Sequence, residues 1–334
     1  MENFESAIVN YIQSTKFEKL SREVIDSVQD RILDSIGVAI AAFNDDAPIA
    51  VRKYALTKQK SNGSTIWGTD IMTDSETAAF ANGTSVRYLD YNDTYLSLEP
   101  LHPSDMIPGL VALAQENNIS GKELVLSIAT GYELAVNLCD VASLRSFGWD
   151  HVSYTGLGAS AGASKLFNFS DEETRSTLAI YSVPHASMRQ TRVGELSMWK
   201  GAAAANAVRN AIFAANVVKS GFTGPYDFFN GEMGYVNQLL GGKLINPDIL
   251  YGSWAGAYGN FQFMPSAIKR YAIDYDNNNK IELKSSLDDA LASAANYINR
   301  LGWNKGQPCF FRVKLTDKIK KKYVNLSARK ISHR

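Results

Sequence analysis

The residues best suited to proton transfer lie within residues 87–105, which read RYLDYNDTYLSLEPLHPSD. Its polar residues include Asp90, Asp93, Thr94, His102 and Asp105. A carboxylate close to a histidine is the usual equipment for moving a proton at neutral pH. Pro100 and Pro103 argue against a buried helix or a central strand. The stretch therefore predicts a polar loop that can carry a site, and the alternative is a solvated loop with Asp93 or Ser104 as a helix N-cap.

Two further candidates follow later in the chain. His151 comes directly after Trp149 and Asp150 in a polar segment, and Lys200 ends the segment VGELSMWK. A second histidine can serve as acid or base, and a lysine can bind a carboxylate. The structural alternatives are a half-buried histidine with satisfied hydrogen bonds and a simple ion pair between Lys200 and Glu195.

Apolar helices must position these polar segments. Residues 74–86 and 107–116 have helical patterns and flank the first polar loop. Ser21, Ser120 and Ser170 are expected N-caps. The pattern predicts loops over residues 145–156 and 193–201, and a short strand or extended connection at residues 64–68. Further helices are expected at residues 4–16, 21–42 and 121–142, from residue 158, after Ser170, and over residues 202–216. The fold class is therefore mainly α.

Composition excludes several classes of function. The chain has 334 residues, of which 45% are hydrophobic, and its 34 basic residues balance its 34 acidic ones. A neutral chain of this kind is not a general nucleic-acid-binding protein. Its two cysteines cannot by themselves hold an iron–sulfur cluster or an all-cysteine zinc site. We see no signal peptide and no apolar run of the ~18 residues that a membrane span needs, so we expect a cytoplasmic location.

Residues from about 20 to 240 resemble the MmgE/PrpD family, which includes 2-methylcitrate dehydratases and cis-aconitate decarboxylases. The blocks DYNDTYLSLEPLHPSD and GELSMWKG are more similar to the dehydratases. The resemblance rests on five blocks in order: DRILDSIGVAIAA, NGTSVRYLDYNDTYLSLEPLHPSD, GWDHVSYTGLGASAGASKL, RQTRVGELSMWKGAAAANAVRNAIFAA and GFTGPYDFFNGEMG.

This resemblance implies an all-helical domain, a homodimer and a small tricarboxylate as substrate. The pocket residues that it implies are Asp90, Thr94, His102, His151 and Lys200. Dehydration without an iron–sulfur cluster needs side chains as base and acid, and no cofactor is expected in this domain. His102 and His151 are the proton-transfer candidates, and acid and base are not assigned between them. Asp90 would tune a histidine, Lys200 would pair with a substrate carboxylate, and Thr94 would hydrogen-bond to it.

Residues 250–313 are similar to a different family, the membrane-bound lytic murein transglycosylase B enzymes, which cleave peptidoglycan. The similarity rests on GSWAGAYGNFQFMPSAIKRYAIDYD and on DDALASAANYINRLGWNKGQP. It implies substrate contacts for Ser253, Gln262 and Tyr297. The catalytic glutamate of that family comes from a segment that has no counterpart here, and neither Glu195 nor Glu232 replaces it.

An aspartate-rich loop in the same region has the spacing of an EF-hand-like Ca²⁺ site. Oxygen ligands would come from side chains at alternate positions and from one backbone carbonyl. The transglycosylase resemblance supplies a carboxylate further along, and the alternative is a polar turn before a helix. The expected Ca²⁺ ligands are Asp274, Asp276, Asn278, the Lys280 carbonyl and Asp288.

The sequence thus predicts three parts: a helical MmgE/PrpD-like domain at residues 1–243, a small, mostly helical transglycosylase-like fragment at 250–313, and a basic tail at 314–334. The usual α/β lid of the first family has no recognisable counterpart. A gene fusion, an in-frame deletion and an assembly artefact all fit this pattern. The leading hypothesis is a 2-methylcitrate dehydratase-like hydro-lyase, impaired if the lid is missing. The alternatives are a peptidoglycan-binding module, which would need export, and a non-catalytic remnant.

Overall fold

The computed structural model describes residues 4–242, 265–278, 281, 283 and 286–303. The chain divides into two compact units, and the change between them falls within residues 258–267. The first unit is helical except for a two-stranded antiparallel hairpin, β1 (Ser64–Thr65) and β2 (Met72–Thr73). The prediction of a mainly α chain is therefore confirmed, and so is the short strand expected at residues 64–68.

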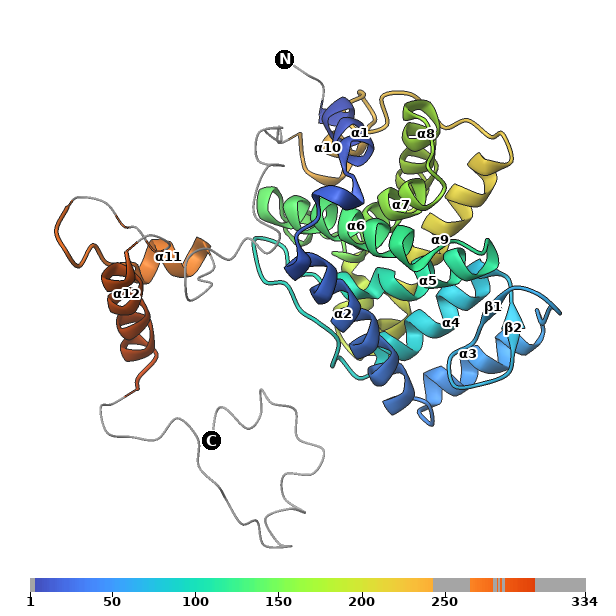
Figure 1. The fold of residues 1–334 in the computed structure, drawn as a ribbon, viewed down its shortest axis with the longest axis horizontal. Coiled ribbons are helices and arrows are strands. Elements are labelled where there is room, and N and C mark those ends of the chain that lie inside the picture. The colour runs from blue at the N-terminus through green and yellow to red at the C-terminus, as the bar shows by residue number, and fades with distance from the viewer. Residues whose placement is uncertain (1–3, 243–264, 279–280, 282, 284–285, 304–334) are drawn as a thin grey trace, which may run out of the picture. The chain divides into compact units, whose positions relative to one another are not determined.

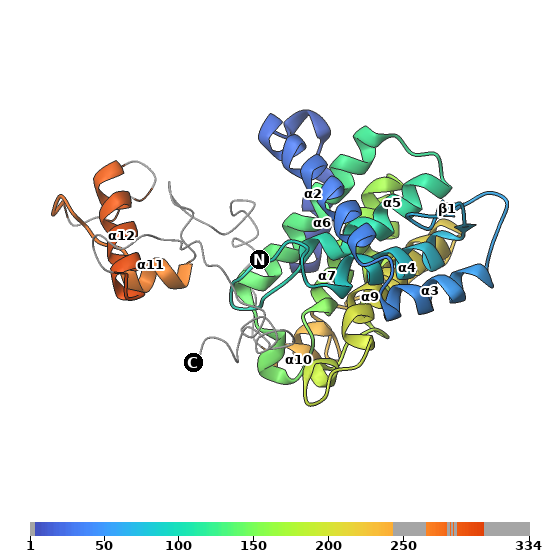
Figure 2. The same cartoon turned by 90° about the horizontal axis from the view of Figure 1, so that it is seen from below.

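Ten α-helices build the described part of the first unit (Figure 1). They are α1 (Phe4–Ser14), α2 (Arg22–Ala41), α3 (Asp46–Leu56), α4 (Ser75–Tyr88), α5 (Ile107–Glu116), α6 (Gly121–Val141), α7 (Val152–Leu166), α8 (Asp171–Ser182), α9 (Trp199–Lys219) and α10 (Tyr235–Leu239). Helix α9 lies between α4 and α7 in both views and packs against each of them (Figure 1, Figure 2). Helix α7 also packs against α6 and α8, so α7 and α9 form the centre of the core.

Small residues make this central packing close. A Cβ atom on Gly158 of α7 would lie 2.6 Å from the carbonyl oxygen of Gly131 on α6. A Cβ atom on Gly83 of α4 would lie 2.9 Å from the Cβ atom of Ala205 on α9. Since these contacts leave no room for a side chain, the Gly- and Ala-rich sequences of these helices set how closely the helices approach.

The structure confirms the N-caps that the sequence predicts at Ser21, Ser120 and Ser170. Ser21 accepts a hydrogen bond from the backbone N–H of Val24 at the start of α2. Ser120 and Ser170 each form a complete capping box with the glutamate three residues later, at the starts of α6 and α8. These bonds satisfy backbone donors that a helix start leaves unpaired, so the boundaries are fixed locally.

Two expected loops of this unit are shorter than predicted. The loop predicted over residues 145–156 ends at His151, because α7 already begins at Val152, and the loop predicted over residues 193–201 ends at Met198, because α9 begins at Trp199. No prediction was made for helix α3, whose sequence DAPIAVRKYAL follows a short polar turn and contains Pro48. Proline is tolerated in the first turn of a helix, where its missing N–H would have no intrahelical partner.

Within the described residues, α6 alone is long and apolar enough to cross a membrane. In the structure 72% of its most apolar window is buried inside the protein. Its neighbours are α2, α5 and α7, so its apolar side chains belong to the helical core.

The described part of the second unit contains α11 (Pro265–Tyr271) and α12 (Leu287–Arg300). Ser286 caps α12 by accepting from the backbone N–H of Asp289 at 3.2 Å. The side chain of Asn296 donates to the carbonyl of Tyr271 at 2.9 Å, so the two helices are joined directly. The basic tail lies outside the described residues.

A candidate acid–base site in the helical domain

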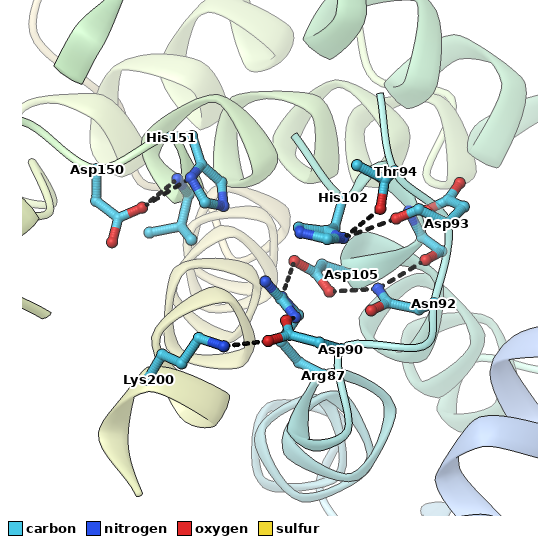
Figure 3. A network of polar contacts seen from close by, with 12 residues as sticks. Arg87, Asp90, Asn92, Asp93, Thr94, His102, Asp105, Asp150, His151 and Lys200 are labelled. Carbon is cyan, nitrogen blue, oxygen red and sulfur yellow. Dashed lines mark hydrogen bonds and ion pairs between the residues drawn. The ribbon is translucent and has the colours of Figure 1, made fainter. Parts of the chain in front are cut away.

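The polar loop between α4 and α5 faces the start of α7 and the start of α9 (Figure 3). The structure brings together the five residues singled out for this domain: Asp90, Thr94, His102, His151 and Lys200. The ring centroids of His102 and His151 are 6.0 Å apart. Lys200 forms an ion pair with Asp90 and not with Glu195. Residues from three distant segments thus lie close to one another (Figure 3).

Hydrogen bonds fix the shape of the polar loop. Tyr95 and Leu101 pair as an antiparallel bridge, with N–O distances of 2.8 and 2.9 Å. The Asp93 carboxylate accepts from the backbone N–H of Ser104 at 2.9 Å and from the hydroxyl of Tyr132 at 3.0 Å. The loop is therefore pinned to itself and to α6, which holds His102 in place.

His102 is held through one ring nitrogen. Its Nδ1 atom lies 2.8 Å from the backbone oxygen of Asp93 and 3.3 Å from Oγ1 of Thr94. Burial, helped by the positive charge of Arg87, lowers the pKa of His102 to about 4. The imidazole is therefore neutral at physiological pH and can accept a proton.

His151 has a carboxylate next to its ring. Its Nδ1 atom lies 3.2 Å from Oδ1 of Asp150. Its Nε2 atom is buried and has no hydrogen-bond partner among the described residues. Burial and the neighbouring Arg192 keep the pKa of His151 well below its ordinary value, so this ring is neutral too.

A buried ion-pair network lies beneath the two histidines. Arg87 is only 3% exposed and contacts the carboxylates of Asp90 and Asp105. Asp90 also contacts Lys200, so this carboxylate is shared by two cations. Its backbone is in the left-handed region at φ 57°, which aspartate adopts more readily than most residues. Burial lowers the pKa of Lys200 from its ordinary value.

A cavity of about 120 Å³ opens beside His151. Three arginines and two carboxylates, Glu99 and Asp150, are among its lining residues, which gives the cavity an excess of one cation. Arginine binds carboxylates in bidentate geometry, so this cavity suits an anion with several carboxylates. The full lining is Glu99, Pro100, Arg145, Trp149, Asp150, His151, Arg189 and Arg192.

These arginines and Arg87 were not among the predicted site residues. Arg189 and Arg192 lie in the block RQTRVGELSMWKG, and Arg87 lies in the polar loop segment. The sequence signal that could have identified Arg87, Arg189 and Arg192 is that each lies in the same short block as a candidate site residue. Arg87 is buried and Arg192 partly buried, whereas Arg145 and Arg189 are exposed. Arginine is common on solvated surfaces, and only the fold shows which arginines meet at one cavity.

Asp105 and His102 should affect the pH dependence of the free energy of unfolding in opposite directions. Burial raises the pKa of Asp105 to about 7 from 3.8, so the folded state keeps a proton that the unfolded state loses. This stabilises the fold at low pH, and the effect is lost as the pH rises towards 7. The pKa of His102 is about 4 in the folded state and 6.5 in the unfolded state. Between these pH values the unfolded state binds the extra proton, so the contribution of His102 to the free energy of unfolding rises with pH.

We therefore expect Asp105→Asn to make the free energy of unfolding rise more steeply with pH than in the wild type. His102→Gln should make the rise shallower. Urea unfolding at a series of pH values between 4 and 7 measures both slopes. Equal slopes for Asp105→Asn and the wild type would contradict the assignment of the raised pKa to Asp105.

The second unit carries the remaining predicted residues. Ser253, Gln262 and Lys280 lie outside the described residues. Tyr297 is on α12, where its ring meets that of Tyr271 edge-on with centroids 5.1 Å apart. Of the three residues expected to contact peptidoglycan, only Tyr297 belongs to the described residues, and it lies beside α11.

Three carboxylates of the second unit converge in a way that suits a hard cation such as Ca²⁺. Ligand atoms of Asp274, Asp276 and Asp289 all lie within 4.8 Å of one another. Asn278 contacts both loop aspartates, its backbone N–H lying 3.2 Å from Asp274 and 3.1 Å from Asp276. The expected Asp288 is exposed and not part of this group. Successive residues of a helix point about 100° apart, so Asp289 turns inward where Asp288 turns out.

Comparison with known proteins gives two family matches. The model for the MmgE/PrpD N-terminal domain matches residues 6–248, and that for the transglycosylase SLT domain matches residues 221–333.

Relatives of the first family include enzymes of two named activities. The mitochondrial 2-methylcitrate dehydratase of Yarrowia lipolytica is 30% identical over 206 residues, covering 58% of this chain and 40% of the relative. The 2-methylcitrate dehydratase of Escherichia coli K12 is 26% identical, covering 70% of this chain and 48% of the relative. Human cis-aconitate decarboxylase is 27% identical, covering 70% and 50%. The chain thus spans about half the length of the curated relatives it matches.

Proposed function

Because this chain belongs to the MmgE/PrpD family, we propose that its helical domain is a hydro-lyase of the 2-methylcitrate dehydratase type. The observation that carries this proposal is a pair of neutral histidines with ring centroids 6.0 Å apart, of which the buried one, His151, lines a cavity with three arginines. Removal of water from a hydroxy acid needs a base for the C–H proton, an acid for the leaving hydroxyl, and cations for the carboxylates. The site offers groups for each of these tasks, and we propose that it uses them without a metal.

The proposed substrate is a small tricarboxylate. Its carboxylates would bind Arg145, Arg189 and Arg192 in the cavity, with Thr94 as a hydrogen-bond donor. Lys200 is reachable, because 29% of its side chain is exposed, and its present partner Asp90 is 41% exposed. A substrate carboxylate that displaced Asp90 would gain the Lys200 ammonium, and Arg87 would keep Asp90 paired.

We also propose that the helical domain forms a homodimer in the cytoplasm. Three exposed apolar side chains of helix α2 support the homodimer: Leu33, Ile36 and Ile40 are 70%, 37% and 47% exposed. Exposed apolar residues that are close together on one helix are typical of an interaction surface.

The direct test is a dehydration assay of the purified full-length chain with 2-methylcitrate, followed by the absorbance of the unsaturated product. We expect the wild type to form product, and a double variant, His102→Ala with His151→Ala, to be slower by about 10²–10⁴-fold, the usual contribution of a proton-transfer group, because it lacks both candidates for that role. Circular dichroism would verify that the variant is folded. No product from folded wild type above the level of the variant would refute an active dehydratase.

A second candidate function is binding of peptidoglycan by the C-terminal part. The observation that favours it is the match of the transglycosylase SLT model to residues 221–333, together with Tyr297 on α12. Inactivity towards 2-methylcitrate, combined with sedimentation of the full-length chain with insoluble peptidoglycan, would favour this function over the first.

A further inference from the structure

We propose that Asp150 is a positioning residue that fixes His151 as the base of the site, with the proton on Nδ1 and the lone pair of Nε2 directed at the substrate. The role of base rests on the proposed function, whereas the protonation pattern rests on the geometry alone. In Figure 3 the ring nitrogen of His151 that does not contact Asp150 points to the side of His102.

The Asp150 carboxylate is held rigidly. Its side chain is fully buried, and both of its oxygens accept from Nε of Arg192, at 3.0 and 2.9 Å. Its backbone N–H donates to the carbonyl of Ser187 at 2.7 Å, and Oδ1 also accepts from the N–H of Val152 at 3.3 Å. Asp150 therefore cannot turn away from the histidine that follows it.

The chemistry of the contact then determines the tautomer of His151. An ionised carboxylate is an acceptor and repels a nitrogen lone pair, so we infer that the Nδ1 atom 3.2 Å away carries the hydrogen. A neutral imidazole has one N–H, so Nε2 keeps its lone pair. This agrees with the burial of Nε2 without a partner in the described part of the chain.

His102 is held in the same tautomer by a weaker partner. The backbone oxygen of Asp93, 2.8 Å from Nδ1 of His102, is also an acceptor only. The two rings differ in what they face. Of the two histidines, only His151 lines the arginine-lined cavity in which the substrate carboxylates would bind, so we assign the base to His151.

The proposed elimination balances with these groups. Nε2 of His151 takes the proton from the carbon next to a substrate carboxylate, and the electrons of that C–H bond form the double bond. The C–O bond breaks, and the hydroxyl leaves as water with a proton from the Lys200 ammonium. His102 has no Nε2 proton to give in its neutral form, so it serves as a hydrogen-bond acceptor.

The first test is the tautomer of His151 in the wild-type protein. Long-range ¹H–¹⁵N correlation spectra of the full-length, ¹⁵N-histidine-labelled chain distinguish the two nitrogens, and a His151→Gln variant assigns the signals. We expect the Nδ1–H form. The Nε2–H form in the wild type would overturn the proposal, whether or not the protein has activity.

The second test is Asp150→Ala, which removes the oxygen that lies 3.2 Å from Nδ1 of His151. Asparagine would not remove it, because Nε of Arg192 and the N–H of Val152 both donate to Oδ1 and would keep the amide oxygen at that position. In Asp150→Ala we expect His151 to lose its preference for the Nδ1–H form and kcat to fall by about 10²–10⁴-fold, the range for a proton-transfer group. Asp150→Glu keeps the carboxylate and should keep the Nδ1–H form.

Asp140→Ala is the matched control, since that carboxylate accepts from the Tyr95 hydroxyl at 2.8 Å and does not touch His151. An Asp150→Ala protein that keeps the Nδ1–H form would overturn the positioning role. If the tautomers are as expected but the wild type shows no turnover, the proposed function is contradicted and the positioning role of Asp150 is not.

Discussion

Replacing His151 with glutamine should lower kcat for dehydration by about 10²–10⁴-fold, the range for a lost general base. Glutamine is close to histidine in size and remains polar, so the buried position beside Asp150 stays filled. It has no nitrogen lone pair to take a proton from carbon. Since the substrate would be held by the arginines and Lys200, KM should change little. Steady-state kinetics with 2-methylcitrate separate the two constants.

His185→Gln is the matched control for this prediction. His185 is half-buried, its Nδ1 atom lies 3.1 Å from the side-chain nitrogen of Asn210, and it borders a different cavity. We expect this variant to keep the kcat of the wild type. Similar losses in both variants would show that the effect on His151 comes from general damage to the fold.

The largest loss of stability is expected for Arg87→Met. Arg87 is 3% exposed, and its partner Asp105 is 1% exposed. Removing one partner of a buried ion pair typically costs about 3–5 kcal/mol, because the other charge is left without compensation. Methionine fills a volume similar to that of arginine, so the main effect of the substitution is the loss of the positive charge. Urea unfolding above pH 7 measures the effect.

Two comparisons identify the cause of that loss. Arg22→Met makes the same exchange in an exposed pair, with Arg22 80% exposed beside Asp26, and should cost at most about 1 kcal/mol. Adding Asp105→Asn to Arg87→Met should recover part of the stability, since no buried carboxylate is then unpaired. The cost of Arg87→Met should also shrink below pH 7, where Asp105 can be protonated. Equal losses for Arg87→Met and Arg22→Met would contradict this account.

Much of the helical framework could be predicted because its signals are local. A serine followed three residues later by a glutamate fixed the starts of α6 and α8. The start of α7 could not be predicted, because SYTG after His151 has the composition of a loop. In the structure Ser153 receives a hydrogen bond from the backbone N–H of Ser187, 34 residues away. That tertiary contact makes a polar residue suitable for a buried helix.

The candidate site was predictable only in part, for a related reason. The histidines, Asp90 and Lys200 belong to short blocks that resemble a known family. The arginines that line the cavity, and Asp150 as a partner of both Arg192 and His151, depend on how distant segments meet. A sequence shows that an arginine is present, but which cavity it lines depends on how distant segments of the chain pack together.

The ion pair between Lys200 and Asp90 closes a loop of 110 residues. Bringing such distant points together costs chain entropy, which the chain must lose before the contact stabilises anything. Proteins dominated by contacts of this kind have a high contact order and fold slowly. In a nascent chain the capped helices α6 and α8 can form early from local signals alone. The catalytic geometry is then a late product of folding, since it exists only once the polypeptide has passed residue 200 and returned to its first hundred residues.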